Sequence, residues 1–129
     1  MPMSEGSMWV WLSVALGGSI GAVARFGVGM VVQSSHFPFA TLFVNAVGSF
    51  VFGVLIQSLD SNTEMAIARS FMIVGFCGSF TTFSTFSFET VHLLKSGNWQ
   101  AGIANLGLSI LLCFSTLILG IWIGKKFVS

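Results

Sequence analysis

The sequence has 129 residues, of which 54% are hydrophobic and only 7% are charged. A soluble domain carries about a quarter charged residues, so this composition is that of an integral membrane protein. The formal net charge is +1 and no long basic run occurs, which excludes a case for nucleic-acid binding. Because one membrane span takes roughly 20 apolar residues, four spans leave little chain for a soluble domain.

Four apolar segments follow one another and predict an all-α membrane protein, a single transmembrane domain over residues 1–129. The expected spans cover about residues 8–32, 40–59, 66–94 and 99–123. No Lys or Arg precedes the first segment and no small-residue cleavage pattern follows it, so we expect this span to be retained. Trp9 and Trp11 open it, as an interfacial aromatic belt does.

Small residues and one arginine mark the first span. Gly17 and Gly21 stand four residues apart, a spacing that lets helices approach closely. Arg25 lies about 24 Å along the helix, which places it near the far interface. Two interpretations of Arg25 stay open: an arginine that snorkels or caps carbonyl groups, and an electropositive collar at an anion vestibule.

The second span has a polar face. In the turn before it we expect His36 to be solvated and Pro38 to precede the helix. The residues that share the face at helical spacing are Asn45, Gly48, Ser49, Phe52 and Ile56. The Asn45 amide could clamp neighbouring helices, or its two N–H donors could bind a halide. The third segment favours the second interpretation.

Near the centre of the third segment, the aliphatic side chains stop. Glycine and hydroxyl residues interleaved with phenylalanine replace them: Gly78, Ser79, Phe80, Thr81, Thr82, Phe83, Ser84, Thr85, Phe86, Ser87 and Phe88. We predict that the helix breaks here at mid-membrane, where protein or water must line the free backbone groups. A half-helix starting near Thr82 directs N–H groups and its positive dipole end at the midplane, a place for an anion. The preceding half-helix ends in free carbonyls, a place for a cation.

Two aromatic rings flank the hydroxyls of Ser84 and Thr85 at the predicted break. Phe83 and Phe86 have positive ring edges, which can coordinate a small, hard anion together with hydroxyl and amide donors. None of these donors carries a full charge that would trap the ion. Conduction requires this compromise between binding and release.

Beyond the break, Glu89 is expected at a solvated rim, where His92 could pair with it, and Gly97 stops the helix. A polar stripe recurs at helical spacing in the fourth span: Asn105, Ser109, Cys113 and Thr116. Hydroxyl residues in such helices often bond only their own backbone, so the stripe alone indicates no function. Cys77 and Cys113 lie in apolar segments without metal-type neighbours and are expected to be free thiols.

Four spans put both termini and the loop after the second span on one side of the membrane. The cations on that side are Arg69, Lys125 and Lys126, against Lys95 and, if it reaches the interface, Arg25. This difference is too small for the positive-inside rule to fix one orientation. Insertion in both orientations would permit an antiparallel homodimer, whose second copy supplies pore wall that four short helices cannot build alone.

Three motifs together resemble the Fluc (CrcB) family of fluoride channels. They are Gly75-Phe-Cys-Gly-Ser-Phe-Thr-Thr-Phe-Ser-Thr-Phe-Ser-Phe-Glu89, Thr41-Leu-Phe-Val-Asn45 and Gly17-Gly18-Ser-Ile-Gly21-Ala22-Val-Ala-Arg25. The first is highly specific and the other two are supportive. The resemblance covers nearly the whole chain in length, order and four-helix plan.

The resemblance implies an antiparallel, dual-topology homodimer in the plasma (inner) membrane, with two fluoride pores and a structural sodium ion at the centre of its interface. The channel would export fluoride passively and protect the cell from fluoride toxicity. By position, the fluoride pathway would comprise Asn45, Phe83, Ser84, Thr85, Phe86 and Ser109. Backbone carbonyls of Gly78 and Thr81 would hold the sodium ion. Arg25 matches the first-helix arginine of the family and is a possible vestibule residue.

The sequence departs from the family pattern at several positions. Ser79 and Phe80 stand where a glycine and a leucine are typical, which could alter the backbone around the sodium ion. Ala40 stands where a glycine usually precedes the Thr-Leu pair. Asn105 and Cys113 stand where tyrosine and serine are typical, which affects the polar track of the fourth helix.

Two other functions were weighed against a passive fluoride channel. A small multidrug-type cation/proton antiporter needs a carboxylate embedded in the membrane, but the first span offers Arg25 and Glu89 is expected at a rim. A non-conducting assembly subunit would use the glycine faces for packing only and has no need of a hydroxyl-rich break. No nucleophile–base pair or metal cluster converges in the sequence, so we expect no enzyme.

Overall fold

The computed structural model describes residues 5–59 and 65–128, and all regular elements in these ranges are helices. The elements are α1 (Glu5–Val31), α2 (Phe39–Ser58), α3 (Ala66–Arg69), the π-helix η2 (Ser70–Cys77), α4 (Gly78–Phe80), α5 (Phe83–Lys95) and α6 (Trp99–Val128). Four segments are long and apolar enough to cross a membrane: Met8–Val31, Phe39–Ser58, Ala66–Lys95 and Trp99–Val128. The predicted all-α fold with four spans is confirmed.

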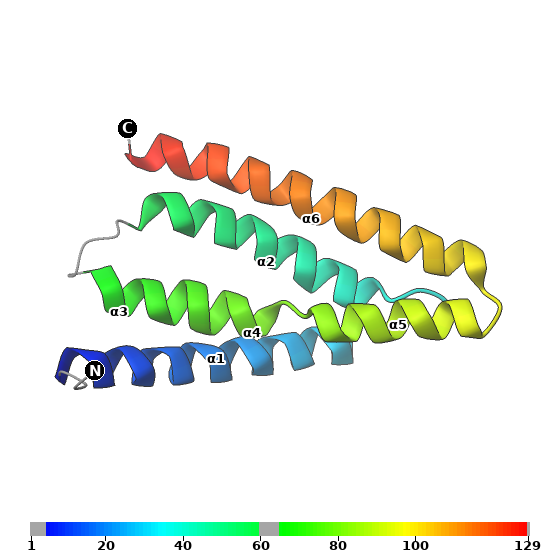
Figure 1. The fold of residues 1–129 in the computed structure, drawn as a ribbon, viewed down its shortest axis with the longest axis horizontal. Helices are drawn as coiled ribbons and strands as arrows, with labels where there is room; N and C mark the ends of the chain where they lie inside the picture. The colour runs from blue at the N-terminus through cyan, green and yellow to red at the C-terminus, as the bar shows by residue number, and fades with distance from the viewer. Residues whose placement is uncertain (1–4, 60–64, 129) are drawn as a thin grey trace.

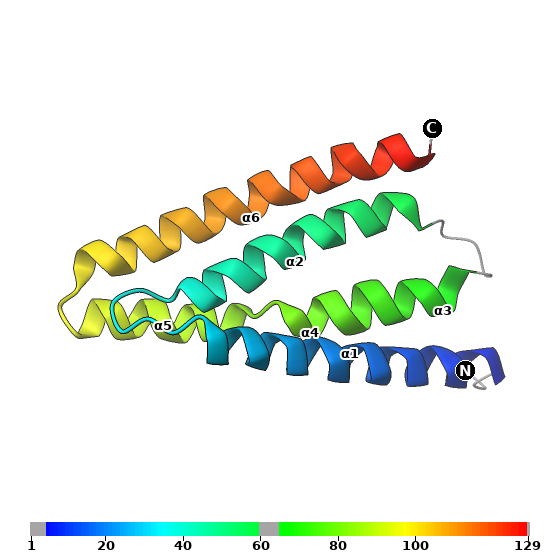
Figure 2. The same ribbon diagram turned by 180° about the vertical axis from the view of Figure 1, so that it is seen from behind.

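The spans follow one another across the molecule from α1 through the third span and α2 to α6 (Figure 1). The first half of the third span, formed by η2 and α4, packs on α1, whereas α5 packs on α6 and α2 lies along α6. The N-terminal end of α1 and the C-terminal end of α6 lie at the same end of the molecule, as the view from behind also shows (Figure 2).

Two glycines bring α1 against the third span. A Cβ atom added at Gly17 would collide with the carbonyl oxygen of Phe71, and one added at Gly21 would collide with that of Phe76. Only glycine allows the two backbones to approach this closely, so the small-residue contact predicted for the first span is confirmed. The partner segment is π-helical, a rare conformation that often occurs near functional sites.

The helix ends follow the local signals of the sequence. Pro38 immediately precedes α2, and His36 in the turn before it is exposed, as expected. Gly97 adopts a φ of 82°, and the N–H groups of Gly97 and Asn98 donate to carbonyls of the last turn of α5. This arrangement is a Schellman motif, which confirms Gly97 as the helix stop.

The molecule has a small interior and wide apolar faces. Its accessible surface is 8436 Å², whereas a compact monomer of this mass exposes about 6,600 Å². The buried apolar side chains gather around the junction of α4 and α5: Leu42, Val44, Ile73, Cys77, Phe80 and Phe86. The many exposed apolar side chains need lipid or another protein surface to cover them.

Candidate functional site

Regular helix stops at two residues between α4 and α5. Thr81 (φ −84°, ψ 158°) and Thr82 (φ −151°, ψ 116°) are both extended. The Thr82 N–H, which a continuous helix would direct to the carbonyl of Gly78, donates instead to Asn45 Oδ1 on α2 at 2.7 Å. The backbone at this point is therefore held by a side chain of another span.

Asn45 binds both sides of Thr82. Its Oδ1 accepts the Thr82 N–H, and its Nδ2 donates to the Thr82 carbonyl at 3.1 Å. This two-point contact fixes the orientation of the amide, because Oδ1 only accepts and Nδ2 only donates. The clamping interpretation of Asn45 is confirmed, and one of its two N–H groups is not used by the clamp.

The hydroxyl of Thr82 caps α5. Thr82 Oγ1 accepts the N–H of Thr85 at 3.2 Å and donates to Thr85 Oγ1 at 3.1 Å, and it lies 3.2 Å from Ser84 Oγ. Such a cap satisfies one of the free N–H groups at a helix start. Three hydroxyl groups thus gather at the N-terminus of α5.

A cavity of about 270 Å³ opens beside these residues, and we call it the break cavity. Its lining consists of Asn45, Ser49, Thr81, Thr82, Phe83, Phe86, Ser109, Ile110, Cys113 and Phe114. The cavity brings together four of the predicted fluoride-pathway residues, from three different spans: Asn45, Phe83, Phe86 and Ser109. Ser84 and Thr85 are not part of its lining.

Three phenylalanines line the break cavity, and the two that were predicted to face the ion, Phe83 and Phe86, differ in their surroundings. Phe86 is 7% exposed, whereas Phe83 is 79% exposed on the face of the single chain. Their ring centroids lie 5.5 Å apart and the ring planes are tilted by 53°. In this geometry the two rings present edges as well as faces to their surroundings.

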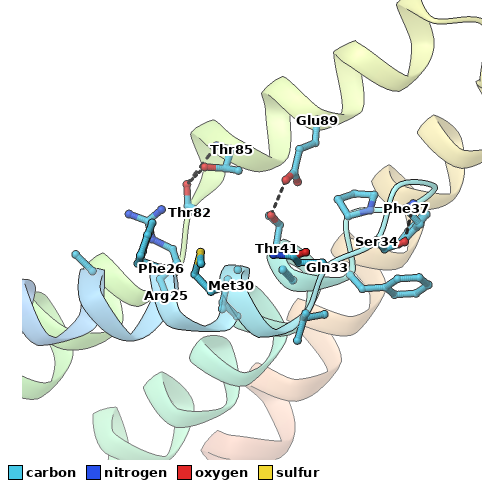
Figure 3. A pocket seen from close by; sticks show the side chains of 17 residues that line it. Arg25, Phe26, Met30, Gln33, Ser34, Phe37, Thr41, Thr82, Thr85 and Glu89 are labelled. Carbon is cyan, nitrogen blue, oxygen red and sulfur yellow. Dashed lines mark hydrogen bonds between the residues drawn. The ribbon is translucent and has the colours of Figure 1, made fainter.

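A second cavity of about 700 Å³ lies between the end of α1, the turn before α2 and α5, and we call it the wide cavity (Figure 3). Arg25, Thr41, Thr85 and Glu89 line it, and Thr82 lines both cavities. Figure 3 shows Thr41 paired with Glu89, and Thr82 paired with Thr85. The wide cavity holds the charged side chains that the break cavity lacks.

The guanidinium of Arg25 reaches the break. Its Nε donates to the carbonyl of Ser79 at 2.9 Å, near the middle of the Ala66–Lys95 span. We expected this side chain near the far interface, whereas its hydrogen bond joins it to a carbonyl near the middle of the third span. The carbonyl-capping interpretation is confirmed, and the same residue also forms part of the wall of the wide cavity.

Glu89 is more enclosed than the sequence suggests. Its Oε1 accepts the hydroxyl of Thr41 at 2.9 Å, and its Oε2 is buried without a hydrogen-bond partner. The solvated rim position stays a prediction, because Glu89 is half-buried and lines the wide cavity while one of its carboxylate oxygens is enclosed. His92 instead stacks on Phe88 with centroids 6.0 Å apart, and within the described ranges no ion pair joins it to Glu89.

Gly78 and Thr81 line a smaller cavity of about 230 Å³ beside the break. Residues of α2, among them Gly48 and Ser49, line the same cavity. Among the described residues no group of three His, Cys, Asp or Glu side chains could hold a metal. A cation at this place would depend on neutral oxygen ligands.

Residues 12–121 match a family model described as "CrcB-like protein, Camphor Resistance (CrcB)". The chain belongs to the CrcB family. It is 41% identical over 125 residues to the fluoride-specific ion channel FluC of Saccharophagus degradans, a match that covers 95% of this chain and 94% of the relative. It is 44% identical over 122 residues to FluC of Hydrogenovibrio crunogenus, with 92% of both chains covered.

This CrcB-family chain is thus a multi-pass membrane protein, and in bacteria the membrane is the inner one. The sequence assigned no role to two polar residues: Thr41, the partner of Glu89, and Thr90, a buried partner of Asn105. Thr90 lies four residues beyond Phe86, on the same helix face. That spacing was the signal available in the sequence, whereas nothing local indicates the pairing of Thr41 with Glu89.

Proposed function

We propose that this chain forms a fluoride-specific channel that exports fluoride passively and protects the cell from fluoride toxicity. The observation that carries the proposal is the break cavity, where an amide, hydroxyls and three phenyl rings from three spans meet without any charged side chain. The names of the CrcB-family relatives, which are fluoride-specific ion channels, support the same function.

The donors of the break cavity suit a small, hard anion. The unused N–H of Asn45, the hydroxyl of Ser109 and the ring edges of Phe83 and Phe86 would replace part of the hydration shell of fluoride. Ser84 and Thr85 would add hydroxyls along the path at the N-terminus of α5, where the helix dipole favours an anion. Because no full positive charge is present, the ion can also leave.

Arg25 would attract fluoride to the entrance of this path. Its guanidinium lines the wide cavity close to Thr82, so it raises the positive potential where an anion would enter. Its bond to the Ser79 carbonyl keeps the charge at the wall of the vestibule. Fluoride would therefore meet a fixed cation before the pore and only neutral donors within it.

The working unit would be an antiparallel, dual-topology homodimer with the break of the third span at mid-membrane. The near-equal cation counts at the two ends and the wide apolar faces of the single chain support this arrangement. Phe83, a lining residue of the break cavity, is 79% exposed in one chain. A second copy would cover this ring and close the pore wall.

A structural sodium ion would be held at the dimer centre by the carbonyls of Gly78 and Thr81. The residues present fit this ion, because freed carbonyls at the end of a half-helix are suitable ligands for it. The Gly78 carbonyl loses the N–H of Thr82 to Asn45, which supports its availability. The ion would supply positive charge that offsets the converging carbonyl dipoles.

Passive export needs no further machinery. Hydrogen fluoride crosses membranes as a neutral weak acid and ionises inside the cell. A selective anion leak then lets fluoride leave down its electrochemical gradient. No ATP site or proton-coupled carrier cycle is required.

The test is fluoride efflux from liposomes that contain the purified protein, with chloride-loaded and protein-free liposomes as comparisons. We expect fast fluoride efflux that depends on the protein and little chloride efflux. Folded protein that passes no fluoride would overturn the proposal. Cation movement driven by a proton gradient would indicate the antiporter instead.

A further inference from the structure

Behind the break cavity, a chain of buried side chains joins α5 to α6. It consists of Thr90, Asn105 and Ser109, which are 7%, 1% and 6% exposed. Ser109 lines the break cavity, whereas Thr90 and Asn105 do not. Thr90 is hydrogen-bonded to Asn105, and Asn105 to Ser109. A change at Asn105 can therefore reach the cavity through Ser109 or through packing, and a change at Thr90 also through its bond to the carbonyl of the lining residue Phe86.

The direction of donation along this chain is fixed at one end. The carbonyl of Phe86 can only accept, and Thr90 Oγ1 donates to it at 2.7 Å. Thr90 Oγ1 has no second proton, so it accepts from Asn105 Nδ2 at 2.8 Å. The Asn105 amide is thereby turned with Oδ1 toward Ser109.

Ser109 Oγ lies 3.5 Å from Asn105 Oδ1, to which it donates a long hydrogen bond. While this bond is made, the Ser109 proton is not available to an anion in the break cavity. To donate to an anion in the cavity, the Ser109 hydroxyl must rotate away from Asn105. Asn105 Oδ1 then loses its hydrogen-bond partner, which costs free energy because the Asn105 side chain is only 1% exposed. The 3.5 Å bond from Ser109 to Asn105 is long and therefore weak, so an anion can displace it.

We propose that Asn105 is a positioning residue that withholds the Ser109 proton and so keeps anion binding in the break cavity weak. The inference rests on the proposed fluoride conduction. Weak binding favours release of the ion, which a conducting pore needs. Asn105 thus controls the Ser109 hydroxyl without contacting the ion itself.

Two substitutions release the Ser109 proton in different ways. Asn105→Leu removes the acceptor and keeps a side chain of similar length. Thr90→Val removes the partner of Asn105 Nδ2, so that the amide can reverse, donate to Ser109 and turn its proton into the cavity. We expect each variant to lower the fluoride concentration that gives half-maximal efflux by about fivefold, the equivalent of one ordinary hydrogen bond, without an increase in maximal rate.

Ser87→Ala is the matched control. The Ser87 hydroxyl donates to the carbonyl of Phe83 at 2.9 Å, as Thr90 does to that of Phe86, but it lies outside the chain of side chains. Its half-maximal concentration should equal that of the wild type.

Ser109→Ala separates action through Ser109 from packing. In this background neither Asn105→Leu nor Thr90→Val should shift the half-maximal concentration further. A shift that persists there overturns the inference, as does an unchanged concentration in folded, conducting single variants. Absence of fluoride efflux from the wild type would overturn the proposed function itself, whereas normal wild-type efflux with unaltered variants overturns only the role of Asn105.

Discussion

The break cavity and the wide cavity meet at Thr82 but differ in their chemistry. The polar groups that line the break cavity are all uncharged. The lining of the wide cavity includes the charged side chains of Arg25 and Glu89. A charge can gather ions from solution, whereas a set of weak neutral donors can pass them on without trapping them. The difference suggests that attraction and passage are separated along the path, on either side of one threonine.

The largest effect should follow from a charge placed in the neutral cavity. Asn45→Asp puts a carboxylate where an anion is to bind and removes the donor to the Thr82 carbonyl. Repulsion of about 4 kcal/mol at 4 Å and an effective dielectric constant of 20 corresponds to a loss of about a thousandfold in flux. Fluoride efflux from liposomes measures it.

Asn98→Asp is the control for this charge. Asn98 is exposed in the turn before α6 and caps Ala101, a role that aspartate performs equally well. Its efflux should be normal. Wild-type efflux in Asn45→Asp would remove Asn45 from the ion path.

The next effect concerns the aromatic edge. Phe86→Ile keeps an apolar side chain in the 7% exposed position but removes the positive ring edge. We expect efflux to fall about tenfold, since an aromatic contact contributes roughly 1 kcal/mol and the repacking adds to the loss. Phe88→Ile, on the same helix but 71% exposed and outside both cavities, should conduct normally. Equal efflux from the two variants would contradict a role for the Phe86 ring.

A smaller effect is expected where the charge of the wide cavity is removed. Arg25→Gln can retain a donor to the Ser79 carbonyl while it loses the cation. Efflux should fall about threefold at low salt and less at high salt, because ions screen attraction at a distance. Lys95→Gln, an exposed cation outside both cavities, should show little change. A loss in Arg25→Gln that is independent of salt would point to a structural role only.

The smallest effect should come from the opposite charge. Glu89→Gln removes the unpaired carboxylate oxygen from the wide cavity and keeps an acceptor for Thr41. Efflux should rise by about twofold, since a negative charge near the path lowers the local anion concentration. A strong decrease would show that the carboxylate takes part in passage, contrary to the division between the two cavities.

The sequence predicted the elements whose causes are local. Apolar length predicts the four spans, and the Gly17–Gly21 spacing predicts a close helix contact. Gly97 predicts the helix stop, where the structure has a positive φ. The π-helical form of Ser70–Cys77 was not predictable, because it depends on the backbone contact with α1 and has no composition signal of its own.

The site was predictable as a set of residue types but not as a network. Asn45 and Ser109 could be named in advance because polar groups are rare in an apolar span. Phe83 and Phe86 could be named because they flank the hydroxyls at the predicted break. The bond from Arg25 to Ser79 joins residues 54 positions apart. Only the packing of the spans determines which distant groups meet, so reasoning along single helices could not find the hydrogen-bond partners of Arg25 and Glu89.

The central claim is that neutral donors around an interrupted third span pass fluoride selectively. The most direct measurement is the reversal potential of the purified wild-type protein in a planar bilayer, with fluoride and chloride gradients in opposite directions. The account predicts a current whose reversal follows the fluoride gradient. A reversal that follows chloride or the cation would contradict it.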